Sequence, residues 1–259
     1  MSAWLESDFL CAAMFVDPKH GNLSHTDLPV WGKYRRSGGQ WVVSLENGFY
    51  GAAIGPRLVC TSRHVRAKSV VRFRGEIFSV WGQSSEKTNR NDSGCFNFIL
   101  LDRDLPDWAP VWRGEALSPS ARVFICSGGA GRGAGVTNGT GTLLGYRPRF
   151  EESRFRWYVN QLATATTLNE VNPTNCPTWT TRFERATGDD AQAVGGDSGG
   201  PAFVDTAEGW KYLGALESAI PAKPGVDYFG IGSSSVGITL LRDLGLVDRY
   251  RGTRRKIPH

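Results

Sequence analysis

Hydrophobic residues occur along most of the chain in short runs that are bounded by glycine, proline, asparagine or aspartate. Runs of this length, alternating or continuously apolar, are typical of the strands of β-sandwiches and barrels. We expect strands at residues 41–45, 49–54, 57–61, 70–73, 96–101, 122–126, 156–159, 202–204 and 212–216. Helical spacing of leucine and isoleucine occurs late in the chain, between Ile238 and Tyr250. The pattern therefore predicts an all-β protein with a short C-terminal helix.

Two segments interrupt the strand pattern. Residues 106–119 contain three prolines and two tryptophans, and we interpret them as the boundary between an N-terminal β-unit and a larger C-terminal one. Residues 128–141 are rich in glycine but contain no G-x-G-x-x-G or G-x-x-x-x-G-K-[ST] motif, so we expect a turn between strands and no nucleotide site. A chain of 259 residues can bury roughly three quarters of its unfolded surface, which is enough for a substantial core.

Composition and charge exclude several classes of protein. An aromatic content of 11% is too high for a disordered chain. The longest apolar stretch near the start, residues 9–16, is too short to span a bilayer, so we expect no membrane partner. The net charge is +5, but the basic residues are dispersed apart from a tail that includes Arg254, Arg255 and Lys256. Because a nucleic-acid binder would gather basic residues into a patch, we expect no nucleic-acid partner.

The cysteines and the N-terminal residues indicate the cellular compartment in which the protein works. The chain has five cysteines, an odd number, and no C-x-x-C pair for zinc or redox chemistry. Glu6 and Asp8 occupy the region where a secretory signal would be positively charged, and no signal peptide is evident. We therefore expect a cytoplasmic protein with free thiols, with an exported mature form as the alternative.

The segment with the clearest chemistry is Gly-Gly-Asp-Ser-Gly-Gly-Pro at residues 195–201. Glycines on both sides of Ser198 let the backbone turn sharply, expose the hydroxyl group and direct amide N–H groups into one small space. Acyl-transfer enzymes need this combination of a nucleophile and backbone donors that stabilise an oxyanion. We expect Ser198 to be the nucleophile and the N–H groups of Gly196 and Ser198 to form the oxyanion hole.

A serine nucleophile needs a neighbouring base, and histidine is the usual one. The chain has four histidines. His20 and His25 lie in an entry segment rich in turn residues, and His259 is the last residue. His64 directly follows a predicted strand that can hold it in place, so we expect His64 to be the general base.

These two motifs resemble those of the trypsin/chymotrypsin-like serine peptidases, within them most closely a divergent bacterial-type branch. Residues 196–201 match the family's Gly-Asp-Ser-Gly-Gly-Pro in full, and residues 59–64 match its Leu-Thr-Ala-Ala-His in part. The order of strands and motifs agrees with that of the family from about residue 41 to residue 218. The resemblance implies a serine endopeptidase that forms an acyl-enzyme on Ser198 and cleaves protein or peptide substrates without a metal or organic cofactor. It also implies that Asp197 braces the oxyanion loop.

The resemblance implies an all-β chymotrypsin-like fold of two six-stranded antiparallel β-barrels with a short C-terminal helix. We expect an N-terminal extension over residues 1–36, the first barrel over 37–112 and the second over 113–235. The helix and a basic tail would occupy 236–259, and residues 37–251 together would form one peptidase domain.

The third member of the catalytic triad departs from the family pattern. A gap-free alignment puts Cys95 where the family has an aspartate that orients the histidine, and a thiol cannot supply the charge of a carboxylate. Asp92 is one candidate for the missing acid, if the turn after it bulges. Glu217, on the strand beside the nucleophile loop, is the alternative. If neither serves, the protein is a weakened or inactive pseudo-peptidase that acts as a protein-binding module.

The resemblance also assigns residues to the substrate pocket. Gln192, six residues before Ser198, corresponds to the floor of the primary pocket, and Ala219 to a wall. Because Gln192 carries no charge, we expect a neutral or polar substrate side chain there rather than Arg or Lys. Proximity in the family template suggests a Cys60–Cys95 contact, with nothing else in the sequence to support it.

Overall fold

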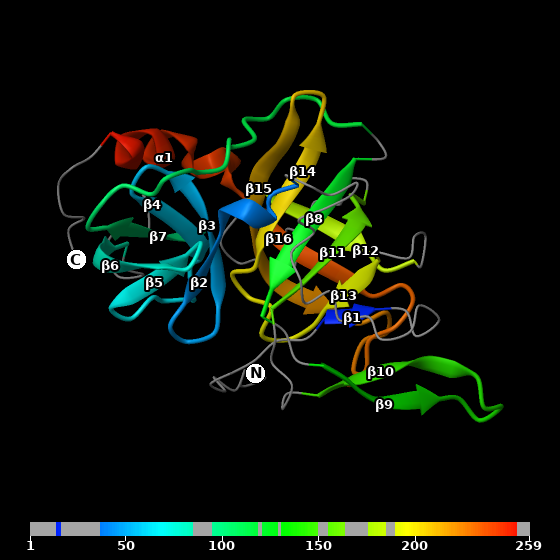
Figure 1. The fold of residues 1–259 in the computed structure, drawn as a ribbon. Coiled ribbons are helices and arrows are strands. Elements are labelled where there is room, and N and C mark those ends of the chain that lie inside the picture. The colour runs from blue at the N-terminus through cyan, green and yellow to red at the C-terminus, as the bar shows by residue number, and fades with distance from the viewer. Residues whose placement is uncertain are drawn as a thin grey trace, which may run out of the picture.

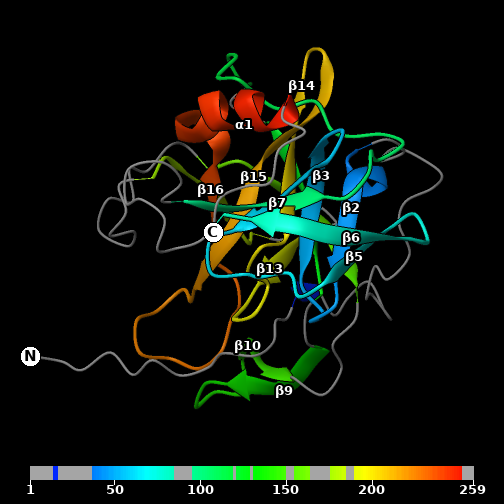
Figure 2. The same ribbon diagram turned by 90° about the vertical axis from the view of Figure 1, so that its left-hand side faces the viewer.

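The computed structural model describes residues 14–16, 37–84, 95–118, 121–128, 131–149, 155–163, 176–184 and 190–252. Two β-units lie side by side, and the C-terminal helix lies over the first of them (Figure 1). The second view, turned by 90°, shows the first unit in front of the second and the helix above both (Figure 2). The chain has the chymotrypsin-like fold that the sequence predicts.

The first unit is a closed six-stranded antiparallel barrel in the order β2-β3-β4-β7-β6-β5. Its strands are β2 (Val42–Leu45), β3 (Tyr50–Gly55), β4 (Leu58–Ser62), β5 (Val70–Phe73), β6 (Glu76–Gln83) and β7 (Phe96–Leu101). The hydrophobic pattern of the sequence did not predict β6, whose side chains are mostly exposed or partly exposed. Arg74 and Gly75 both have positive φ, 49° and 83°, and join β5 to β6 in a two-residue hairpin. Two positive φ angles suit the twist of such a hairpin, which is why a glycine is found there.

The second unit is a six-stranded sheet in the order β11-β8-β14-β15-β16-β12. Its strands are β8 (Arg122–Ser127), β11 (Arg156–Gln161), β12 (Thr178–Arg182), β14 (Pro201–Thr206), β15 (Gly209–Ile220) and β16 (Ser234–Thr239). The edges of the sheet meet at one bridge, between Leu162 and Thr181, so the sheet curls into a half-barrel. β16 crosses the boundary predicted at residue 235.

Two smaller pairs of strands lie beside the second unit. β9 (Gly131–Thr137) and β10 (Leu143–Arg149) form a hairpin that projects from the body (Figure 1). The prediction of only a turn in this glycine-rich segment was therefore wrong, because backbone pairing between the two strands needs no apolar side chains. β1 (Met14–Val16) pairs antiparallel with β13 (Ala191–Ala193), which leads into the nucleophile loop.

The core joins the two units and the helix. A cluster of buried residues from both units includes Ile54, Phe98, Phe203 and Tyr212, and it also includes Val247 of the helix. A short 3-10 turn, η4 (Leu240–Asp243), precedes the helix α1 (Leu244–Arg251). These contacts fix the two units against each other, so residues at their junction have defined positions.

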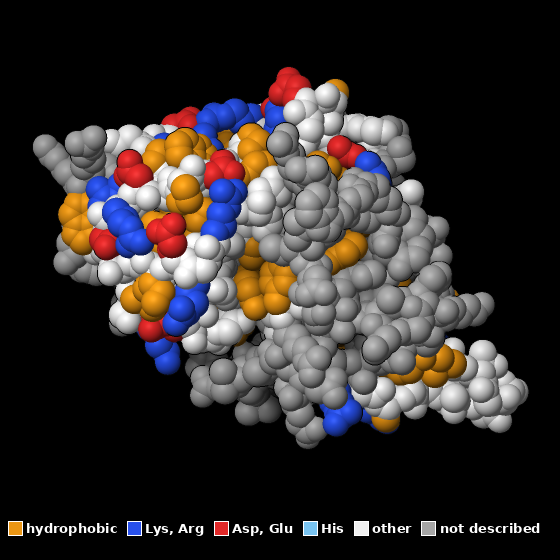
Figure 3. Space-filling model, in the orientation of Figure 1, with side chains coloured by type: hydrophobic (Ala, Val, Ile, Leu, Met, Phe, Trp, Pro, Cys, Tyr) orange, Lys and Arg blue, Asp and Glu red, His pale blue; other side chains and the backbone are white. Residues whose placement is uncertain are grey.

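The exposed surface of the first unit carries mixed charge. Acidic and basic side chains alternate over the described part of the face in Figure 3, with no single sign dominating. Ion pairs such as Arg103 with Glu76 and Arg113 with Asp248 contribute to this pattern. Within the described ranges, no helix is long and apolar enough to cross a membrane.

Candidate active site

The nucleophile loop connects β13 to β14 through two tight turns. Asp197 N donates to Val194 O at 3.2 Å, and Gly200 N donates to Asp197 O at 3.0 Å. Gly196 has φ +91° and Gly199 has φ +79°, a left-handed conformation that side chains with a Cβ rarely adopt. The glycines on both sides of Ser198 are therefore required by the backbone path, as the sequence predicts.

The loop presents unpaired backbone donors around Ser198. In the part of the chain that the structure describes, the N–H groups of Gly196 and Ser198 donate to no acceptor. Both residues are partly exposed to solvent. Backbone N–H groups that are free and fixed in position can stabilise a developing negative oxygen without reorganising.

Asp197 holds the shape of this loop from beneath. Its side chain is buried, with a relative exposure of 2%. One carboxylate oxygen accepts from Val194 N at 3.0 Å, and the other accepts from the hydroxyl of Ser127 on β8. A buried carboxylate that accepts such bonds ties the loop to the body of the second unit.

Gly199 links the nucleophile loop to the strands on either side. Its N–H donates to Leu216 O of β15 at 2.9 Å, and its carbonyl accepts from Thr61 Oγ1 of β4 at 3.4 Å. A Cβ on Gly199 would lie 2.2 Å from Thr61 Oγ1 and 3.1 Å from Val65 Cγ2. Thr61 and Val65 flank His64 in sequence, and Ser198 precedes Gly199. The fold therefore brings the segment that carries His64 against the segment that carries Ser198.

His64 lies beside a carboxylate on β15. His64 Nδ1 is 3.6 Å from Glu217 Oε1, and the side chains are 43% and 18% exposed, respectively. This separation is longer than a hydrogen bond. Glu217 Oε2 is buried and has no hydrogen-bond partner in the described part of the protein. No hydrogen bond between His64 and Ser198 is found among the described residues.

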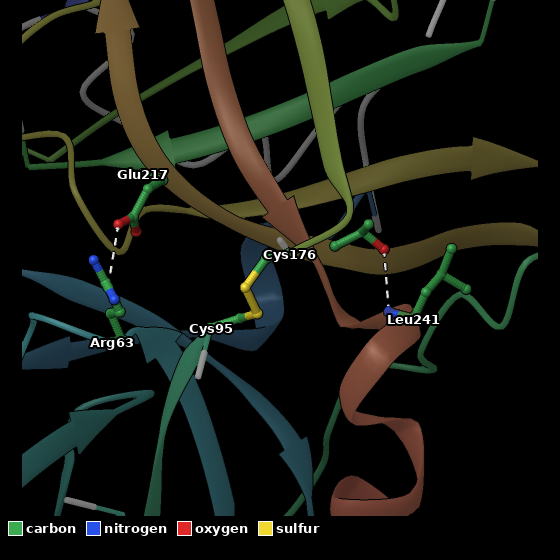
Figure 4. Close-up of a disulfide and its surroundings, with 6 residues drawn as sticks. Arg63, Cys95, Cys176, Glu217 and Leu241 are labelled. Atoms are coloured by element: carbon green, nitrogen blue, oxygen red, sulfur yellow. Dashed lines mark hydrogen bonds and ion pairs between the residues drawn. A yellow bond between two sulfur atoms is a disulfide. The ribbon is translucent and has the colours of Figure 1, made fainter. Parts of the chain in front are cut away.

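Arg63 approaches the same carboxylate oxygen as His64. Arg63 Nε is 3.8 Å from Glu217 Oε1, and the Arg63 side chain is 38% exposed. Figure 4 shows the Arg63 and Glu217 side chains directed toward each other from the two units. The sequence analysis did not identify Arg63, although its position next to His64 was available as a signal.

The two candidates for the missing acid have different outcomes. Asp92 lies outside the described residues. Glu217 lies beside His64, with 3.6 Å between Glu217 Oε1 and His64 Nδ1. Cys95, at the position expected for the acid, is fully buried and forms a disulfide with Cys176 (Figure 4).

The cysteine predictions need correction. Cys95 pairs with Cys176, 81 residues away, and not with Cys60 as the family template suggested. The expectation of free thiols is thus wrong for this pair, because a spacing of this length gives no local signal. Cys60 and Cys126 are free and buried, and desolvation raises the pKa of each thiol well above its ordinary value. Buried thiols of this kind are unreactive, and both residues belong to the core.

The predicted pocket residues lie at the junction of β13, β15 and β16. Gln192 is fully buried, and its Nε2 donates to Ser234 O at 3.1 Å, while its Oε1 is buried without a partner in the described ranges. Its backbone is paired with Phe15 of β1. Ala219 is partly exposed and lies opposite Ser235 across the sheet. Within the described ranges, no three His, Cys, Asp or Glu side chains are arranged to hold a metal ion.

Comparisons with known proteins agree on the fold. No protein-family model and no curated protein matches the sequence. A solved structure of a mutant of human heparin binding protein (CAP37) matches with a TM-score of 0.54 and 16% identity, over 88% of this chain and 97% of its own. Kallikrein-related peptidase 10 matches with a TM-score of 0.51 and 15% identity, over 82% of this chain and 96% of its own.

Identities this low establish the fold alone. One of these two neighbours is named as a binding protein and the other as a peptidase, so the fold by itself does not decide between binding and catalysis. Membership of a bacterial-type branch stays a prediction. The decision depends on the residues of the site.

Proposed function

We propose that this protein is a serine endopeptidase that cleaves protein or peptide substrates through an acyl-enzyme on Ser198. The observation that carries the proposal is the contact of Gly199 with both Thr61 and Leu216. It joins the nucleophile loop to the strand end that bears His64 and to the strand that bears Glu217.

The reaction would proceed in two halves. Ser198 Oγ attacks the substrate carbonyl carbon and gives its proton to His64, and the carbonyl oxygen takes on negative charge next to the N–H groups of Gly196 and Ser198. The C–N bond then breaks, and the leaving amine takes the proton from His64. Water attacks the acyl-enzyme with His64 again as base, and the carboxylic acid product leaves Ser198 in its original state.

Glu217 is our proposed orienting group, in place of the family's aspartate. An imidazole that accepts a proton becomes a cation, and the nearby carboxylate stabilises it and favours the correct ring orientation. The support is the separation of 3.6 Å between His64 Nδ1 and Glu217 Oε1, together with the buried Oε2, which has no hydrogen-bond partner among the described residues. Glu217 acts through His64, so it is a positioning residue.

A second candidate function is that of a binding module without chemistry. The disulfide at Cys95 favours it, because that position cannot supply the usual acid. A fluorophosphonate probe separates the two functions, since it reacts only with an activated serine. We expect the folded protein to be labelled at Ser198 and expect no labelling of Ser198→Ala or of heat-unfolded protein. Folded protein that stays unlabelled supports the binding module.

We also propose that the protein works in an oxidising compartment, as an exported mature form. The support is the Cys95–Cys176 disulfide, because such bonds persist mainly outside the reducing cytosol. Mass spectrometry of unreduced peptides from the native source tests this. Free thiols at both positions would contradict it.

A further inference from the structure

Arg63 places a positive charge at the candidate active site that the proposed reaction does not use. It immediately precedes His64, and both side chains approach the same oxygen of Glu217, at 3.8 and 3.6 Å. Because they share one oxygen, the guanidinium and the imidazole are close neighbours. A substrate that reaches His64 therefore also comes close to Arg63.

The guanidinium group of Arg63 is only partly satisfied. Its one ion pair in the described part of the protein is through Nε, and its two terminal nitrogens have no partner there. The side chain is 38% exposed, so part of it is open to a substrate. An arginine fork with free terminal nitrogens matches the two oxygens of a carboxylate.

We propose that Arg63 forms a subsite for a substrate carboxylate, so that this peptidase prefers peptides with Asp or Glu within two residues of the cleaved bond. This inference rests on the proposed function. It also supplies the charge selectivity that Gln192, which is uncharged and fully buried, does not. The net charge of +5 adds a long-range attraction for acidic substrates.

Binding of such a carboxylate would also affect the chemical step. In the free protein, Arg63 and His64 share Glu217 Oε1. A substrate carboxylate that pairs with Arg63 neutralises the cation beside the imidazole. Glu217 then interacts with His64 alone. The developing imidazolium is then better stabilised in the transition state than in the ground state. We therefore expect an acidic substrate to raise kcat as well as lower KM, whereas a simple binding subsite would lower KM alone.

The test uses pairs of peptides that differ only by Glu or Gln, placed in turn at each of the two positions on either side of the cleaved bond. At one position, the wild type should show kcat/KM about fivefold or more higher for Glu, with part of the gain in kcat. Arg63→Gln should bring this ratio close to one. Arg72→Gln is the matched control and should keep the ratio, because exposed Arg72 lies on β5, separated from β4 by β6 and β7.

Two outcomes overturn the inference. They are a wild-type ratio near one at every position, and a preference for Glu that Arg63→Gln retains. If turnover is too slow to measure, the Glu and Gln peptides are compared by how strongly each protects Ser198 from the fluorophosphonate probe. If neutral peptides are cleaved without a preference for Glu, only the Arg63 subsite fails. If Ser198 is not labelled and no peptide is cleaved, the proposed function fails with it.

Discussion

Replacing Glu217 by Gln isolates the contribution of one charge to the candidate site. Gln has nearly the same shape, so the packing of this largely buried side chain is retained while the negative charge is lost. Two opposite charges about 4 Å apart attract by about 4 kcal/mol at the effective dielectric typical of a protein surface. His64 is 43% exposed, so solvent screening reduces this substantially, to about 2 kcal/mol. Glu217→Gln should therefore slow activation of Ser198 by roughly 30-fold.

This loss is smaller than that of a fully formed triad. Where the acid hydrogen-bonds directly to the histidine, its neutralisation costs about 10⁴ in kcat. The separation of 3.6 Å between Nδ1 and Oε1 is beyond hydrogen-bond length, so the interaction here is weaker in the free protein. A loss nearer to 10⁴ would mean that the gap closes when the probe or substrate binds.

The assay is the second-order rate constant of Ser198 labelling by a fluorophosphonate, which needs no knowledge of the natural substrate. Ser198→Ala and His64→Ala define the background. Glu184→Gln is the matched control, because Glu184 is exposed and also forms a 3.8 Å ion pair with an arginine, Arg182. It should label at the wild-type rate. If Glu217→Gln also labels at that rate, Glu217 does not orient His64, and Asp92 becomes the remaining carboxylate to test.

Three further predictions concern stability and the geometry of the loop. Burial raises the pKa of Asp243 from 3.8 to about 6, so the folded state binds this proton more tightly than the unfolded state, and stability falls as the pH rises from about 4 to about 6. Asp243→Asn should remove this pH dependence of stability and raise the free energy of unfolding above pH 6 by up to about 3 kcal/mol, measured by urea titration. A variant with the pH dependence of the wild type would contradict this. The Cys95–Cys176 disulfide closes a separation of 81 residues, so Cys95→Ser with Cys176→Ser should lose about 4 kcal/mol, and a reductant should lower the Tm of the wild type but not of the double variant. Gly199→Ala should lower the free energy of unfolding by about 2 kcal/mol and reduce labelling of Ser198. Gly48→Ala is the control, because Gly48 has a similar φ of +84° but a Cβ there would have nothing within 4 Å, so this variant should show the backbone strain alone. Equal losses in the two variants would mean that the close contact at Gly199 is relieved.

The sequence alone predicted most of the strands of the two units. Mostly apolar runs such as residues 96–101 and 122–126 became β7 and β8, because a strand with both faces in the core is largely apolar. It missed β6 (Glu76–Gln83), whose side chains are mostly exposed or partly exposed, and the hairpin of β9 and β10, which is rich in glycine. In these three strands backbone pairing, not side-chain burial, defines the element. It also missed the largely buried strands β12 and β16, and Ile238, predicted to begin the helical pattern, belongs to β16.

The chemistry of the nucleophile loop was also visible in the sequence. The glycines around Ser198 are required by positive φ angles and by close approach to Thr61, and such backbone demands leave a local signature in the choice of residue. The roles of Ser198 and His64 themselves stay predictions until the labelling experiment is done.

Only the tertiary structure decided which residues meet across the two units. The pairing of Cys95 with Cys176 and the approach of Arg63 and His64 to Glu217 join residues that are far apart in the chain. Neither a cysteine nor a glutamate carries a local mark of its distant partner, because its choice depends on how the barrel and the half-barrel pack. Local preferences determine the strands, whereas the packing of the two units determines which side chains from different strands share a site.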